Sequence, residues 1–562
     1  MSSDSNVVAL VPWSMSVRRA VSRRRVFDLL DDKDAPNKIR ALDPLETYYA
    51  VKEVGLEDAG PILALLAPEQ IGALVDVEAW HHQRFDPQDL LLWLYAFREG
   101  GLEALAAAGR AMDREVLALL LRRRLWIAMT PRENDTDPDP IPDWLRDPPD
   151  EILPLVKTPD GRFVVAARID DEVDEVTVDE EDRKGVLQIV DDLYKQEDWE
   201  EVAATLRLAL TDLSSSMEED ALRFRNARLE DFGFPPLHRA IEIYGPLDPD
   251  VLERPAPAPE PLPTTTIPAR YTAALDDGLF SAALSAVRDA KQIQRIEGDL
   301  VAVANRTLVA DGAEPGELEA LTASLSRLRG YLEIALAHQV EPARRIEVGA
   351  DRLERVPIAD LARVGYTITL RLGQRARALS NKYGVERLED DDRALFEALG
   401  RKRPRLSHLG IERGFDGPDD VVWVEDRVAR LEGLLAGASA LQLLDVALEG
   451  AIEPPPAERT IDVLIATAAA RAVRGDGFVA TPLDAEALAD LADRLGVEGG
   501  PRFGEADVVR AQEALAPLED DVRAVMRDAV EGALVRLADA LWPLVGATID
   551  PRFVGVVLRR LG

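Results

Sequence analysis

Three arginines spaced for one helix are the strongest candidate ligand-binding group in this chain. Arg225 and Arg228 are three residues apart, so a helix would place both guanidinium groups on one face, with Arg223 just before them. Guanidinium groups placed this way hold a carboxylate or phosphate through paired hydrogen bonds. Glu219 lies four residues before Arg223, which favours ion pairs within the helix. We therefore favour an ion-pair network and keep an anionic-ligand site as the alternative.

A second candidate group surrounds two adjacent histidines. Trp80, His81 and His82 are followed closely by Arg84 and Phe85. Imidazole nitrogens are common metal ligands, but adjacent side chains point in different directions and seldom hold one ion together. No cysteine is present to complete a zinc site. We expect a structural or surface role for the histidines, with no metal and no cofactor. The candidate binding residues here are Trp80, His81, His82 and Arg84, and Arg84 beside Phe85 is the candidate for a recognition patch.

The histidines lie in a stretch that repeats itself. Asp43-Pro44 and Asp86-Pro87 each have the pattern of a helix start, because aspartate caps free N–H groups and proline fits the first helical position. These starts are 43 residues apart, and later positions align at an offset of 46, which pairs Trp80 with Trp126. Paired helices with a period of about 40–47 residues are typical of HEAT-like solenoids. The sequence therefore predicts short HEAT-like repeats within 26–130.

The middle region carries the β signal and the densest negative charge. Two apolar runs, 152–157 and 162–168, flank a Pro-Asp-Gly turn, which predicts a β-hairpin. Nine carboxylates follow between Asp170 and Asp182. Such a run is usually a solvated loop, and divalent-cation binding is the alternative. Helices are expected at 184–194 and 199–210, and after a capping box at 216–219.

Beyond a Pro-rich stretch the chain is expected to be helical. Proline recurs through 255–268, which is typical of an extended linker. Small residues at 433–440 indicate a close contact between two helices. The segments expected to be helical are 269–311, 314–352, 357–384, 389–400, 419–451, 459–473, 484–496 and 506–548.

The predicted fold class is mainly α, in several domains. It combines the short HEAT-like N-terminal repeats with a small β-hairpin in the middle region and a C-terminal helical bundle. The expected parts are a basic tail (1–25), a helical repeat domain (26–130), an acidic linker with the hairpin and helices (131–254), the Pro-rich linker (255–268), a helical domain (269–413) and a C-terminal helical domain (414–562).

Composition narrows the classes of function. The 103 acidic and 67 basic residues give a formal net charge of −36, which disfavours binding of the protein body to nucleic acid or anionic membranes. A basic cluster at 18–25 is an exception, and we favour a solvated helix turn there over a docking arm. No apolar run reaches the roughly 18 residues of a membrane span, and no secretory signal pattern is present. A cytoplasmic protein is expected.

Six stretches carry a family pattern, at 45–55, 80–86, 219–235, 240–244, 431–437 and 464–467. Over most of its length the chain resembles an uncharacterised bacterial family that is classed as a domain of unknown function. That resemblance implies no activity. The N-terminal repeat is also loosely similar to the helical cytosolic domain of bacterial magnesium transporters.

The sequence contains no familiar catalytic motif. It lacks a P-loop, a Rossmann glycine fingerprint, His-Glu-x-x-His and Gly-x-Ser-x-Gly. The leading hypothesis is a cytoplasmic protein-binding scaffold or adaptor without catalytic activity, with protein partners or self-association. One alternative is a regulatory protein that responds to divalent cations through its acidic segment. Another is an unfamiliar enzyme or anionic-ligand binder that uses Arg223, Arg225 and Arg228.

Overall fold

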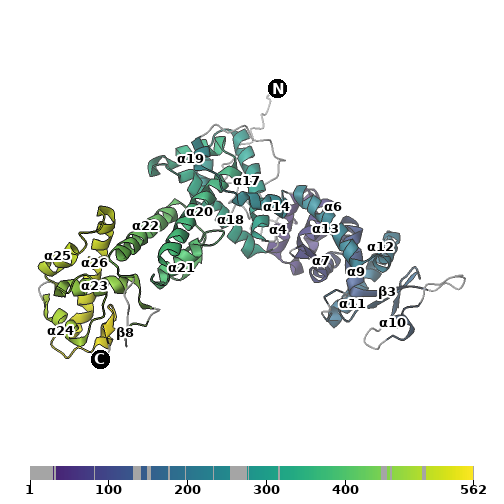
Figure 1. Ribbon diagram of the computed structural model, residues 1–562. Helices are drawn as coiled ribbons and strands as arrows, with labels where there is room; N and C mark the ends of the chain where they lie inside the picture. Colours follow the sequence, from purple (N-terminus) through teal and green to yellow (C-terminus); the bar gives the residue numbers. More distant parts are fainter. Residues whose placement is uncertain are drawn as a thin grey trace, which may run out of the picture. The chain divides into compact units, whose positions relative to one another are not determined.

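The computed structural model describes residue 30 and residues 33–560, apart from 82, 131–140, 149–153, 172, 175–176, 197, 232, 254–274, 276, 314–316, 445–451, 456–457 and 497–500. The basic tail, the Pro-rich linker and much of the acidic linker lie outside the described residues. The fold is mainly α (Figure 1), which confirms the predicted class. In the described part, no helix has both the length and the apolar character needed to cross a membrane. The chain divides into two compact units, Met1–Arg363 and Val364–Gly562, and each is described by itself.

After α3, the first unit has two successive groups of helices, α4–α6 and α7–α9. Asp43 Oδ1 accepts hydrogen bonds from the N–H groups two and three residues later, at 2.9 and 3.4 Å. Asp86 Oδ1 caps the second group in the same way, at 2.8 and 3.1 Å. Both predicted helix starts are confirmed, while their origin as repeats stays a prediction. The helices are α3 (Ala35–Arg40), α4 (Pro44–Val54), α5 (Gly60–Leu63), α6 (Pro68–Glu78), α7 (Pro87–Glu99), α8 (Leu102–Ala111) and α9 (Arg114–Arg124).

Short strands follow each of these groups. β1 (Trp80–His81) pairs with β2 (Arg84–Phe85) after α6. After α9, β3 (Leu125–Met129) joins an antiparallel sheet in which β5 (Phe163–Ala167) lies between β3 and β4 (Val156–Lys157). The predicted hairpin is confirmed as β4 and β5. Its pairing with β3 was not predicted, because the sequence gives no signal for a partner about 40 residues away.

Further helices complete the first unit. They are α10 (Asp143–Arg146), α11 (Glu180–Tyr194), α12 (Trp199–Thr211), α13 (Ser214–Asp231), α14 (Leu237–Ala240), α16 (Leu279–Ala286), α17 (Ala290–Asp311), α18 (Leu318–Ala337) and α19 (Arg345–Arg355). The buried helix α9 packs against both α12 and α13 (Figure 1). This packing brings α9, at the end of the predicted repeat domain, against two helices that follow the acidic run in the sequence.

The second unit is built around α26, which packs against α22 and α23. A Cβ on Gly433 would lie 3.1 Å from Val525 on α26, which confirms the predicted close helix contact. The helices are α20 (Ile358–Tyr383), which begins in the first unit, α21 (Asp390–Leu399), α22 (Pro418–Ala440), α23 (Ile461–Arg474), α24 (Ala485–Asp493), α25 (Glu505–Glu513) and α26 (Asp520–Leu541). The paired strands are β6 (Leu406–His408) with β7 (Ile411–Arg413), β8 (Ile452–Glu453) with β11 (Arg559–Arg560), and β9 (Leu495–Gly496) with β10 (Arg502–Phe503).

Some predicted helix limits are wrong. The helix α13 begins at Ser214, so Ser216 stands in its first turn and its backbone N–H donates to Leu213 O at 3.1 Å. The segment expected at 269–311 contains two helices, because α16 ends at Ala286, where Val287 is extended, and Asp289 caps α17 by accepting from Lys291 N at 2.9 Å. The segments at 314–352 and 506–548 are likewise divided into two helices each.

A pair of facing carboxyl groups in the second unit gives a prediction about pH. Burial raises the pKa of Glu389, the charge and hydrogen bond of Asp462 raise it further, and Asp392 adds to the effect while Arg536 opposes it. A carboxyl group whose pKa is higher in the folded state lowers stability as pH rises above its unfolded value. We expect Glu389→Gln to unfold at a higher urea concentration than the parent at pH 7.5, with the difference disappearing towards pH 4.

The control for that experiment is Glu397→Gln, which changes an exposed carboxylate on α21, the helix that Glu389 immediately precedes. Its unfolding midpoint should follow that of the parent at both pH values. A gain for Glu389→Gln that is the same at pH 4 and pH 7.5 would contradict the electrostatic explanation.

Candidate functional site

Arg228 joins α13 to the carboxylate of Asp76, on α6, and to that of Asp113, which immediately precedes α9. Its Nε and Nη2 lie 2.7 and 2.8 Å from the two carboxylate oxygens of Asp76, and its Nη1 donates to Asp113 Oδ1 at 3.0 Å. Asp76 lies on α6 and is 1% exposed. Burial raises the pKa of Asp76, and the hydrogen bonds and charge of Arg228 oppose that shift. Arg228 is therefore the counter-ion of a buried carboxylate.

The other two arginines of this group have different surroundings. Arg225 is buried, donates from Nε to the backbone oxygen of Asp76 at 2.6 Å, and lies 5.7 Å from the centre of the Trp80 ring. Arg223 is exposed and pairs with Asp220 at 3.0 Å. The three side chains do not converge on one ligand position. The contacts of Arg225 and Arg228 are structural and tie α13 to α6.

His81 lies beside two aspartates at the start of α7. Its Nε2 is 2.7 Å from Asp89 Oδ2. With Asp86 these residues form the one group in the described part of the chain that has three potential metal ligands within 4.8 Å of one another. Asp86 caps α7 and His81 is paired with Asp89, so the arrangement is accounted for without an ion. His82 lies outside the described residues.

Two carboxylates of the acidic run bind arginines of the first unit. Asp171 accepts from Arg123 Nε at 2.9 and 3.0 Å, and both side chains are 3% exposed. Asp174 pairs with Arg123 and, at 2.9 Å, with the exposed Arg84. Burial opposes the ionisation of Asp171, but hydrogen bonds from Arg123 and from two backbone N–H groups hold its pKa below the usual value. These two carboxylates have cationic side chains as partners, so they are not open cation ligands.

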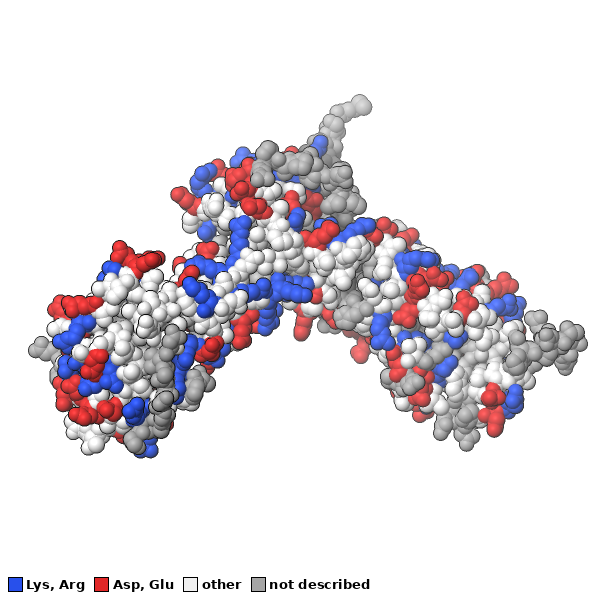
Figure 2. Space-filling model, viewed as in Figure 1, with Lys and Arg blue, Asp and Glu red and all other residues white. Residues whose placement is uncertain are grey.

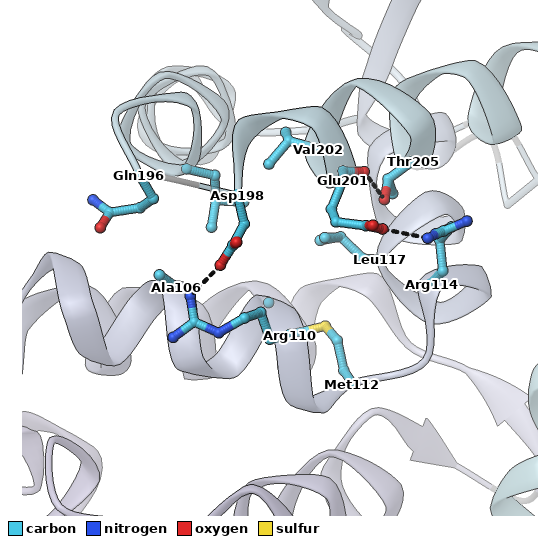
Figure 3. A pocket seen from close by; sticks show the side chains of 12 residues that line it. Ala106, Arg110, Met112, Arg114, Leu117, Gln196, Asp198, Glu201, Val202 and Thr205 are labelled. Carbon is cyan, nitrogen blue, oxygen red and sulfur yellow. Dashed lines mark hydrogen bonds and ion pairs between the residues drawn. The ribbon is translucent and has the colours of Figure 1, made fainter.

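A pocket of about 360 Å³ lies between α8, α9 and α12 (Figure 3). A Cβ on Gly109 would lie 3.3 Å from Leu193 Cδ2, so the absence of a side chain at 109 leaves room between α8 and the end of α11. Apolar side chains form the uncharged part of the pocket lining, which we call its floor. They belong to Ala106, Met112, Leu117, Leu193 and Val202.

Charged side chains stand at the mouth of the pocket, with bases on one wall and acids on the other. Arg110 Nη1 lies 2.8 Å from Asp198 Oδ2, and Arg114 pairs with Glu201 (Figure 3). All four side chains are between 49% and 65% exposed. Exposed ion pairs contribute only about 0–1 kcal/mol. A ligand with charges of its own could replace these pairs at little energetic cost.

None of the pocket residues was singled out from the sequence. The run of small residues at 106–109 was the available signal, because small side chains leave space on a helix surface. The opposite wall lies 88 residues further along the chain, as the pairing of Arg110 with Asp198 shows. No local pattern identifies such a partner.

Comparison with known proteins gives a family but no function. A family model described as a family of unknown function, DUF6178, matches residues 5–560. No curated protein and no solved structure matched the chain. The family match covers the pocket, the α13 arginines and both units, and it confirms the resemblance to an uncharacterised family. The chain belongs to the family of unknown function DUF6178.

Proposed function

We propose that this protein is a cytoplasmic protein-binding adaptor and that the pocket between α8, α9 and α12 receives a side chain of its partner. The observation that carries the proposal is the combination of an apolar floor with an exposed, two-sided charged mouth. Pockets that bind ligands usually have volumes of about 300–1,000 Å³, apolar walls and a few polar groups that fix orientation. A volume of about 360 Å³ is at the lower end of that range and suits one or two large side chains.

The charges at the mouth indicate what the partner should carry. Arg110 and Arg114 lie on one wall, and Asp198 and Glu201 lie on the other. An incoming aliphatic or aromatic residue flanked by an acid on one side and a base on the other would match both walls. Burial of the apolar group would supply affinity, at about 25 cal/mol per Å² of apolar surface.

The lining favours binding over catalysis. Its two carboxylates, Asp198 and Glu201, are exposed and paired with arginines, and its hydroxyl, on Thr205, donates to Glu201 O at 2.9 Å. A general base or nucleophile needs a free, positioned group with a tuned pKa. The side chains at the mouth are arranged to orient a charged partner.

The alternatives have less support from the contacts. Regulation by divalent cations would use carboxylates of the acidic run, yet Asp171 and Asp174 are paired with arginines. Binding of an anionic ligand at α13 would require Arg228 to leave the buried carboxylate of Asp76. Either event would leave a buried charge without its partner, which is energetically expensive.

Filling the pocket tests the proposal. We expect a photo-crosslinking amino acid at position 196, on the pocket lining, to attach a partner protein to the full-length chain in its native cells. Ala106→Phe places a ring in the pocket and should lower the crosslink yield by at least about fivefold, since a filled pocket excludes the partner's central side chain. Leu102→Phe, on the exposed part of the same helix, should leave the yield unchanged.

Two results would overturn the proposal. One is a crosslink yield that Ala106→Phe does not change, although the variant keeps the melting temperature of the parent. The other is a small molecule retained by the purified protein in native mass spectrometry and lost on the Ala106→Phe change, which would make the pocket a small-ligand site.

A further inference from the structure

A second feature, in the Val364–Gly562 unit, is independent of the pocket. Residues 366–383 of α20 contain four basic residues and no acidic residue. Residues 398–411 also contain four basic residues and no acidic residue. In a chain with a formal net charge of −36, two such segments are unusual. The eight cations are Arg371, Arg375, Arg377, Lys382, Arg401, Lys402, Arg403 and Arg405.

The fold places the two segments against each other. Arg377 Nε donates to Gly400 O at 2.9 Å, and its Nη2 donates to the backbone oxygen of Arg401 at 3.1 Å. Tyr366 Oη donates to the backbone oxygen of Lys402 at 3.0 Å. Gly373 permits this approach, because a Cβ there would lie 2.4 Å from Leu399 O. The second segment therefore packs against the face of α20 that carries Tyr366, Gly373 and Arg377, whereas Arg371, Arg375 and Lys382 lie on the opposite face of that helix. We call the surface formed by Arg377, Arg401, Lys402, Arg403 and Arg405 the cationic surface.

The five cations of this surface outnumber the acidic side chain that pairs with them. Glu412 pairs with both Arg401 and Arg405 at 2.6 and 2.8 Å. This carboxylate comes from outside the two segments, which themselves contain only cations. In Figure 2 basic side chains gather near the middle of the view, where Figure 1 labels α20. Four of these five cations are arginines, which bind carboxylates through paired hydrogen bonds.

The β6–β7 hairpin adds an exposed apolar tip next to these cations. Leu409 and Ile411 are 71% and 67% exposed. Leu409 also has a φ of 49°, in the left-handed region, where a residue with a Cβ costs about 1–2 kcal/mol. The next residue, Gly410, has a φ of 76°, and glycine is the residue type usually found at that position of such a turn. Asparagine or glycine at 409 would suit both the turn and the solvent better than leucine does.

The base of the hairpin is held in place, so its tip projects from a fixed position. The rings of His408 and Trp423, on α22, are 4.8 Å apart. Leu406 and Ser407 are buried beside α21. An exposed leucine in a strained conformation on a well-supported hairpin indicates a residue that contacts something else.

We propose that the cationic surface and the Leu409–Ile411 tip together dock an acidic segment of a partner protein that also carries aliphatic side chains. The arginines would bind its carboxylates, and the tip would bury its aliphatic groups. An aliphatic tip matches a peptide better than a nucleic acid, whose bases stack on aromatic rings. A membrane would require more than two inserted aliphatic residues on a body this acidic.

Selection of peptides by display on the full-length protein tests this proposal. The expected result is enrichment of sequences that combine aspartate or glutamate with leucine, isoleucine or valine. Synthetic versions should bind in a salt-sensitive way, and Lys402→Glu with Arg403→Glu should weaken them by at least about tenfold, because reversed charges repel the ligand. Arg527→Glu, an exposed cation on α26 of the same unit, is the matched control and should change affinity less than about twofold.

Leu409→Asn separates binding from folding. This change removes the exposed aliphatic group and places a residue that tolerates positive φ. We expect peptide affinity to fall at least about fivefold while the melting temperature stays equal or rises. Val535→Asn, an exposed aliphatic residue on α26, should not affect affinity.

Several outcomes would overturn the inference. They are enrichment of peptides without acidic residues, affinity that the reversed charges leave unchanged, or no enrichment at all. Binding of single-stranded DNA, of RNA or of phosphatidylserine vesicles in place of the peptides, abolished by the same charge reversal, would assign the surface to another partner. Ala106→Phe should not alter peptide binding here, so failure of the pocket proposal and failure of this inference are distinguishable.

Discussion

Arg123→Ala is expected to destabilise the first unit by about 3–5 kcal/mol, the usual cost of removing one partner of a buried ion pair. Arg123 and Asp171 are each 3% exposed, and Arg123 also donates to Phe85 O at 3.1 Å. Without the Arg123 guanidinium, the Asp171 carboxylate stays buried, and its remaining ion pair is the longer one with Arg124, whose Nη1 lies 3.2 Å from Asp171 Oδ2. Urea unfolding followed by tryptophan fluorescence would measure the loss.

Arg84→Ala is the matched control for this experiment. Arg84 and Arg123 both pair with Asp174, but the Arg84 side chain is 72% exposed. Its removal should cost less than about 1 kcal/mol, because solvent already screens that pair. Equal losses for the two variants would show that burial is not what makes the Arg123 contact important.

The pH dependence of the Arg123 effect has a definite sign. The pKa of Asp171 is held below its usual value in the folded protein. Its ionised form therefore adds stability above the unfolded pKa, near 3.9, and that contribution is lost as pH falls further towards the folded pKa. The difference between the parent and Arg123→Ala should accordingly be largest near neutral pH and shrink below about pH 4.

Local signals in the sequence predicted local structure well. Asp43 and Asp86 cap the helices that they were expected to cap, because the Asp-Pro pattern is satisfied by atoms within three residues. The β4–β5 hairpin was likewise recognisable, since its strands adjoin one turn. Such interactions need no knowledge of the rest of the fold.

Features that depend on distant residues could not be predicted. The partner of Arg228 is Asp76, 152 residues away, whereas the sequence offered acids within one helical turn. The β6–β7 hairpin was missed because its turn is Leu409-Gly410 and not the common Asn-Gly or Asp-Gly. The cationic surface was also missed, although the basic run at 401–405 is visible in the sequence. Its significance depends on α20 lying beside it.

Trp80 gives the second large effect. Its side chain is 0% exposed and packs edge-on against Phe85, with ring centres 5.6 Å apart. Trp80→Ala should destabilise the first unit by about 3–5 kcal/mol, because a large cavity would open beneath Arg225. The indole Nε1 has no hydrogen-bond acceptor among the described residues. Trp80→Phe should therefore cost much less than Trp80→Ala, since it keeps most of the ring volume and removes an unsatisfied donor.

Comparison with Trp126 makes the experiment informative about architecture. The two tryptophans occupy matching positions in the predicted repeat, but Trp126 is half-buried on β3, with its ring 5.8 Å from that of Trp144. Trp126→Ala should cost clearly less than Trp80→Ala in the same urea titration. Equal costs would contradict this expectation and would mean that the two helix groups are energetically equivalent. A smaller cost for Trp126→Ala would show that the deeper burial of Trp80, against Phe85 and Arg225, sets its larger contribution.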